Sequence, residues 1–213
     1  MYLHLQKEIF IETIDMINSK SNIPKDILEK DYYVCLVLQE LAKNQDYLKA
    51  YFKGGTAVYK ILPTMNRFSE DIDLTVEVIE TDSKTNNKNR LKESATGYKI
   101  VGLELQENKT ERIADKAITA FYNYDTDFED LEIPLYKAGV IQVESTSFTI
   151  SEPVEKCIVE PLIYKYATND QKAILKEKFN LSEFAIGTLT LERIFIDKLF
   201  AVEAYYRKQI IKI

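Results

Sequence analysis

The stretches RFSEDIDL, at residues 67–74, and KGGTAVYK, at residues 53–60, decide the fold of this chain. In the first, Asp71 and Asp73 begin a segment in which polar and apolar residues alternate as far as Val78. Such a period of two, rich in β-branched residues, predicts a half-buried strand. Both aspartates then lie on one face with Cα atoms roughly 6.5–7 Å apart, and carboxylates at this spacing suit a pair of Mg²⁺ ions. The alternative is the polar face of an ordinary amphipathic strand.

The second stretch holds a glycine pair between a short apolar segment, residues 47–53, and a helical pattern that precedes Pro63. Glycine lets backbone N–H groups approach a phosphate, and the N-terminus of a helix attracts negative charge. Gly54, Gly55 and Thr56 are therefore candidates for binding the triphosphate of a nucleotide, with Thr56 adding a hydroxyl donor. An ordinary tight turn is the alternative. Neither a Walker A loop nor a dinucleotide fingerprint occurs in the sequence.

Together the two stretches resemble the AbiEii/AbiGii toxin family of nucleotidyltransferases, a MenT-like branch of the DNA polymerase β-like superfamily. Three further segments match the family's motifs in the same order: EKDYYV at residues 29–34, VIQVE at residues 140–144 and LERIFIDKL at residues 191–199. The similarity extends from about Lys25 to Arg207. It implies a polymerase β-like nucleotidyltransferase fold.

The resemblance also implies roles for individual residues. The residues it assigns to catalysis through two Mg²⁺ ions are Asp71, Asp73 and Glu144. Those it assigns to the triphosphate are Gly54, Gly55, Thr56 and Lys198, of which Lys198 also takes part in catalysis. A lysine is a compact point charge suited to phosphate oxygens. We expect the apolar stripe beside Lys198 to face the core, through Phe195, Leu199 and Val202.

Two positions in these motifs keep alternative interpretations. Lys198 could be a solvated surface lysine rather than a phosphate ligand. Lys30 and Asp31 could form a structural ion pair near the site or act in it directly, and the sequence favours neither.

The implied activity is the transfer of a nucleoside monophosphate from an NTP to an acceptor hydroxyl. The family suggests a toxin of a toxin–antitoxin or phage-defence system that modifies tRNA, with a cognate antitoxin encoded nearby. Two other classes stay open: a non-catalytic nucleotide-binding module, and a nucleotidyltransferase that modifies a small molecule such as an antibiotic.

One family motif has no counterpart. In relatives a run like Arg-x-x-Asp-Leu-Tyr-Asp-Leu follows the lysine helix, whereas this sequence stops at Ile213. The chain is either shorter than its relatives or part of a longer protein. We expect a nucleotidyltransferase core with N-terminal helices at residues 1–150, and a helical segment at residues 151–213 that starts a C-terminal helical domain.

Composition limits the classes of function. The net charge of −6 argues against a broad nucleic-acid surface, and the cations at residues 84–92 and 172–178 favour solvated faces. The single histidine, His4, is expected at the surface, which excludes histidine catalysis and a His-rich zinc site. Cys35 and Cys157 lack metal-ligand spacing. We expect them to be buried free thiols in a protein of a reducing compartment. No apolar run reaches the ~18–20 residues of a membrane span and no secretory signal is visible, so we expect a cytoplasmic protein without a membrane partner.

The pattern along the chain predicts an α+β fold with a mixed β-sheet flanked by helices. Helices are expected at residues 3–17, 24–41, 56–62, 171–179 and 190–208. Strands are expected at residues 47–53, 71–78, 99–105, 116–124 and 138–148. The polar stretch from Glu80 is expected to begin as a loop and to end in a short helix. Residues 155–166 fit either a strand or a broken helix around Pro161.

Overall fold

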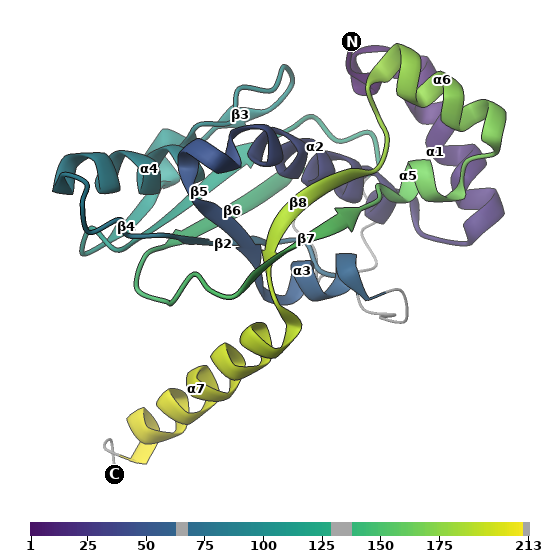
Figure 1. Cartoon of the computed structure of the whole chain (residues 1–213). Helices are drawn as coiled ribbons and strands as arrows, with labels where there is room; N and C mark the ends of the chain where they lie inside the picture. The colour runs from purple at the N-terminus through teal and green to yellow at the C-terminus, as the bar shows by residue number, and fades with distance from the viewer. Residues whose placement is uncertain (63–67, 129–137, 211–213) are drawn as a thin grey trace.

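The computed structural model describes residues 1–62, 68–128 and 138–210, with the backbone alone at 208–210. Within these residues the chain forms one mixed sheet of eight strands in the order β3-β5-β6-β2-β1-β8-β7, with β4 paired to β5 (Figure 1). The strands are β1 (Ala50–Lys53), β2 (Ile72–Val76), β3 (Glu104–Leu105), β4 (Glu111–Ile113), β5 (Ala117–Asn123), β6 (Val140–Thr146), β7 (Val154–Val159) and β8 (Phe184–Leu189). The pairs β2–β6 and β1–β8 are parallel, and the predicted α+β fold with a mixed sheet is confirmed.

Helices flank this sheet (Figure 1). They are α1 (Lys7–Ser21), α2 (Lys25–Leu48), α3 (Gly54–Ile61), α4 (Lys84–Thr96), α5 (Leu162–Tyr166), α6 (Asn169–Phe179) and α7 (Leu191–Ile210), with 3-10 turns at Leu3–Leu5 and Glu107–Lys109. Helix α2 packs on β8 and β1, and α4 packs on β5 and β6. None of the helices in the described part of the chain is long and apolar enough to cross a lipid bilayer.

The alternation of apolar residues assigns one face of the sheet to the core. Ala50 and Phe52 of β1 and Ile72 and Leu74 of β2 are fully buried. Successive side chains of a strand point to opposite faces, so the residues between them project from the other face. The predicted strand at residues 71–78 is confirmed as far as Val76, after which the chain leaves the sheet.

The second half of the chain departs most from expectation. Residues 155–166 contain most of β7 and all of α5, and Pro161 is the N-cap residue of α5. Strand β8 was not predicted, and only two residues of the expected strand at 99–105 form β3. Segment 151–213, expected to be helical, therefore contributes two strands to the same sheet as β1 and β2. Pro63, predicted to end α3, lies outside the described residues.

Helix α7 projects away from the sheet after β8 (Figure 1). The prediction that its apolar stripe faces the core is wrong: Phe195, Leu199 and Val202 are 63%, 54% and 52% exposed. Among the described side chains of α7, Ile194 alone is buried, because only the first turn of the helix reaches the body of the protein.

The predictions for the two cysteines and the histidine are confirmed only in part. Cys35 and Cys157 are free thiols; Cys35 is buried as predicted, whereas Cys157, which was also predicted to be buried, is only half-buried. His4 is not a free surface residue, since its ring stacks on Tyr2 and contacts Tyr32. Its Nε2 donates to the carbonyl of Val101 at 2.7 Å, and its Nδ1 lies 2.8 Å from the hydroxyl of Tyr32. Burial lowers the pKa of His4, which favours a neutral ring whose Nδ1 accepts from the Tyr32 hydroxyl.

Candidate active site

The glycine turn brings the start of α3 against the strand that carries the aspartates. Gly54 follows β1 directly and has φ of +80°, a conformation that other residues rarely adopt. A Cβ atom at Gly54 would lie only 2.0 Å from Oδ2 of Asp73. Position 54 therefore requires glycine for two reasons: the positive φ angle of the backbone and the close approach of the Asp73 carboxylate.

The start of α3 is open to a ligand. Its N-cap residue, Lys53, makes no side-chain capping hydrogen bond, so the first N–H groups of the helix lack that partner. Thr56 does not extend a hydroxyl toward this opening, because it is buried and donates to Oγ of Ser69 at 2.9 Å. Ser69 thereby keeps its own proton for another acceptor. We therefore add Ser69, which the sequence analysis did not single out, to the candidate phosphate ligands.

The predicted carboxylates lie in neighbouring strands. Asp73 is directly opposite Glu144 in the parallel pair β2–β6, and Asp71 precedes β2 by one residue and is exposed. Burial, followed by the charge of Glu144, raises the pKa of Asp73 to about 6, and Asp71 adds to this effect. The strand register thus places Glu144, which the resemblance singled out, beside Asp73.

The donor chemistry of these carboxylates fits Mg²⁺. Asp73 and Glu144 present acidic oxygens that repel one another at neutral pH, and a divalent cation between them would remove that repulsion. In the described part of the chain, no three His, Cys, Asp or Glu side chains already converge as a metal site. A metal ion would therefore have to draw the side chains together, and the assignment of metal ligands stays a prediction.

Helix α7 brings cations to the edge of the same face. Lys198 is exposed, and its charge lowers the pKa of Asp73 slightly against the effect of burial. One turn earlier, Arg193 pairs with Asp197 at 2.8 Å, and both charges act on Lys53. The position of Lys198 near the carboxylates agrees with its predicted role, and its exposure leaves it free to meet a ligand.

Lys53 was also missed by the sequence analysis, although it stands in the quoted motif. It lies directly opposite Asp73 in the antiparallel pair β1–β2. Its ammonium group donates to the hydroxyls of Thr146 at 2.9 Å and Thr149 at 3.2 Å. A lysine that ends a short strand next to a glycine pair is a weak signal without the strand register.

The EKD segment of α2, residues 29–31, forms buried ion pairs and hydrogen bonds with residues around the candidate site. Glu29, Lys30 and Asp31 are all buried. Lys30 pairs with Glu70 at 2.9 Å and also donates to the carbonyl of Val140, which ties the residue before Asp71 to the start of β6. These buried contacts agree with the structural interpretation of this segment.

Asp31 forms the second buried ion pair of this segment. Its carboxylate pairs with Lys60 of α3 and accepts a hydrogen bond from the backbone N–H of Leu162 at 2.8 Å. The side chains of Asp31 and Lys60 are 1% and 4% exposed. The pair fixes the C-terminal half of α3 and therefore the direction of its N-terminus toward Asp73.

Replacing Asp31 with alanine is expected to lower the free energy of unfolding by about 3–5 kcal/mol, because the Lys60 charge would stay buried without its partner. Urea denaturation measures this change. The matched control is Glu40→Ala, which breaks a more exposed pair with Lys43 on the same helix and should cost about 1 kcal/mol or less. Equal shifts for the two variants would contradict the structural role of Asp31.

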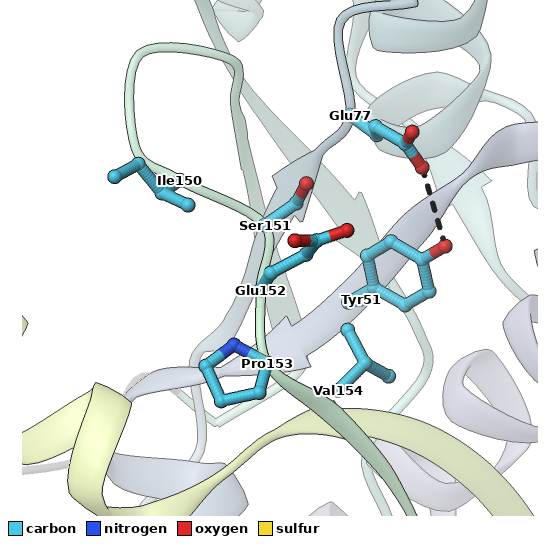
Figure 2. Close-up of a pocket in the computed structure, with 7 residues that line it drawn as sticks. All are labelled: Tyr51, Glu77, Ile150, Ser151, Glu152, Pro153 and Val154. Atoms are coloured by element: carbon cyan, nitrogen blue, oxygen red, sulfur yellow. Dashed lines mark hydrogen bonds between the residues drawn. The ribbon is translucent and has the colours of Figure 1, made fainter.

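A pocket of about 600 Å³ lies farther along the candidate active-site face of the sheet (Figure 2). The hydroxyl of Tyr51 donates to Oε2 of Glu77 at 3.4 Å across it. Two carboxylates, Glu77 and Glu152, line this pocket, and burial followed by the charge of Glu77 raises the pKa of Tyr51. Phosphate groups would be repelled here, which leaves the start of α3 as the better position for a triphosphate.

Comparison with known proteins identifies the family of this chain. The family model described as nucleotidyl transferase AbiEii toxin, type IV TA system, matches residues 36–210. Among solved structures, a crystal structure from H. pylori, described as that of a candidate nucleotidyltransferase, matches with a TM-score of 0.46 and 16% identity. That match covers 83% of this chain and 59% of that chain, so this chain spans less than two thirds of its length. No curated protein matches. Because the family model covers most of the sequence, the chain belongs to the AbiEii family of nucleotidyl transferase toxins.

Proposed function

We propose that this chain binds an NTP with Mg²⁺ and transfers its nucleoside monophosphate to an acceptor hydroxyl. The observation that carries the proposal is the close approach of Gly54, at the open start of α3, to Asp73, which in turn lies opposite Glu144. A phosphate-binding helix N-terminus and a pair of carboxylates thus meet at one point of the sheet. Membership of the AbiEii family supports the same chemistry.

In this proposal Asp71, Asp73 and Glu144 hold Mg²⁺, which when bound supplies charge neutralisation and a more reactive acceptor oxygen. The N–H groups at the start of α3, together with Ser69, bind the triphosphate. The acceptor oxygen then forms a bond to the α-phosphorus while the bond from that phosphorus to the bridging oxygen breaks. Pyrophosphate leaves, its charge offset by Lys198, and the acceptor proton passes to water.

For the acceptor we propose the 3′ end of tRNA, and for the biological setting a cytoplasmic toxin with a cognate antitoxin, active in phage defence. The support is the family description, which names a toxin of a toxin–antitoxin system. Because the net charge of the chain is −6, we expect its contact with a polyanion such as tRNA to be confined to a local surface.

The acceptor is tested by incubating the protein with Mg²⁺, each of four α-labelled NTPs, and either total tRNA or a set of aminoglycosides. We expect label in tRNA with at least one NTP. Label in an aminoglycoside alone would reassign the acceptor to a small molecule. Label in neither would contradict the proposed transfer.

A further inference from the structure

Lys53 differs from the other enclosed lysines around the site. Lys30 pairs with Glu70, and Lys60 pairs with Asp31. Within residues 1–62, 68–128 and 138–210, no carboxylate lies within the 4.0 Å of an ion pair from Nζ of Lys53. Lys53 therefore carries an enclosed charge whose direct partners are neutral.

Those partners hold the ammonium group in one direction. Thr146 donates its own proton to the carbonyl of Leu74 at 3.1 Å, so a lone pair of its hydroxyl faces Lys53. Thr149 shares a hydrogen bond with Thr75 at 2.9 Å and accepts from Lys53 at 3.2 Å. An ammonium group has three donors, and these two hydroxyls use two of them. The third N–H is available to an anion.

Burial and the nearby carboxylates act on the charge of Lys53 in opposite directions. Burial lowers the pKa of Lys53, and this effect exceeds the opposing attraction of Asp73, Asp197 and Glu144. Enclosing a charge without an ion pair costs folding free energy. Such local costs are expected where a residue serves a ligand, since functional sites depart from the rules that stabilise the rest of a fold.

We propose that Lys53 binds a phosphate oxygen of the NTP, as a further ligand that rests on the function proposed above. The residue directly precedes Gly54 and lies opposite Asp73, and its ammonium group is close enough to Asp73 and Glu144 for their charges to act on it. A lysine hydrogen bond to phosphate is charge-assisted and about twice as strong as a neutral one. The threonine pair aims this donor, and Lys198 approaches the same carboxylates from α7.

The test measures binding rather than activity, and uses inorganic tripolyphosphate with Mg²⁺ so that no base preference enters. Titration calorimetry compares the wild type with Lys53→Met, Lys53→Arg and Lys92→Met. Lys53→Met is expected to weaken binding by about tenfold to a hundredfold, and Lys53→Arg by less because it keeps the charge. Lys92→Met, an exposed site on α4 across the sheet, is expected to bind like the wild type.

Thermal unfolding separates binding from structure. A methionine at position 53 removes an enclosed charge and keeps the shape of the chain, so the melting temperature is expected to stay the same or rise. A fall in melting temperature together with equal losses in Lys53→Met and Lys53→Arg would show a structural role and overturn the inference. Lys53→Gln provides the same comparison if Lys53→Met does not fold.

The outcome for the wild type separates this inference from the proposed function. Unchanged binding in Lys53→Met beside a wild type that binds tripolyphosphate would refute the role of Lys53 and leave the proposed function standing. A wild type that does not bind tripolyphosphate with Mg²⁺ would contradict the proposed function itself.

Discussion

Replacing Asp73 with asparagine is expected to lower the rate of nucleotidyl transfer by on the order of 10³-fold, or about 4 kcal/mol of transition-state stabilisation. Asp73 is central to the site, since it lies opposite both Lys53 and Glu144 in the sheet. Its carboxylate also fills the space that a side chain at Gly54 would need. Asparagine keeps the shape of the side chain and removes one of the charges proposed to hold Mg²⁺. The rate of label transfer to the acceptor at saturating NTP measures the effect.

The stability of this variant is a second readout. Burial and Glu144 raise the pKa of Asp73, so at pH 7 the ionised carboxylate opposes folding and its removal should leave the free energy of unfolding unchanged or higher. The control is Asp115→Asn at the exposed end of an ion pair with Lys88, which should keep the wild-type rate. An Asp73→Asn enzyme with more than a tenth of the wild-type rate would place the catalytic carboxylate elsewhere.

Replacing Gly54 with alanine is expected to lower the transfer rate by at least about a hundredfold, because small misplacements of catalytic groups carry losses of that size. The new Cβ would lie 2.0 Å from Oδ2 of Asp73, so the carboxylate must move. The φ of +80° adds about 1–2 kcal/mol of backbone strain. Kinetic assays and urea denaturation of the same preparation separate the two effects.

Gly102 offers the matched control for strain alone. It has φ of +85°, and an added Cβ would lie 2.7 Å from the ring of His4, away from the candidate site. Gly102→Ala should therefore lose stability to a similar extent and keep its transfer rate. If both variants lose activity equally, the contact between Gly54 and Asp73 is not what matters for catalysis.

Local sequence patterns predicted the strands and the helix that carry the first half of the candidate site. The alternation from Asp71 to Val76 required one buried and one polar face, and the structure buries Ile72 and Leu74. The glycine pair correctly predicted a strand–turn–helix unit, because few other features need a positive φ followed directly by a helix. Glu144 was placed by family resemblance, and the strand register then put it beside Asp73.

The remaining features depend on contacts between distant residues. Lys53 became a candidate only when β6 placed Thr146 beside it, and Ser69 only when Thr56 was seen to donate to it. Strand β8 was missed because its residues carry no period-two pattern: four consecutive residues of it are buried. The apolar residues of α7 predicted burial that the direction of the helix after β8 does not provide.

The central claim is that Asp73 and its neighbours support transfer of the α-phosphoryl group with its nucleoside. The most direct measurement runs parallel reactions with α-labelled and γ-labelled NTP, Mg²⁺ and total tRNA, and follows the label into acceptor and pyrophosphate. The account predicts α-label in the acceptor and γ-label in pyrophosphate, both lost in Asp73→Asn. Transfer of γ-label to the acceptor would show phosphoryl transfer and contradict it, as would α-label incorporation that survives in Asp73→Asn.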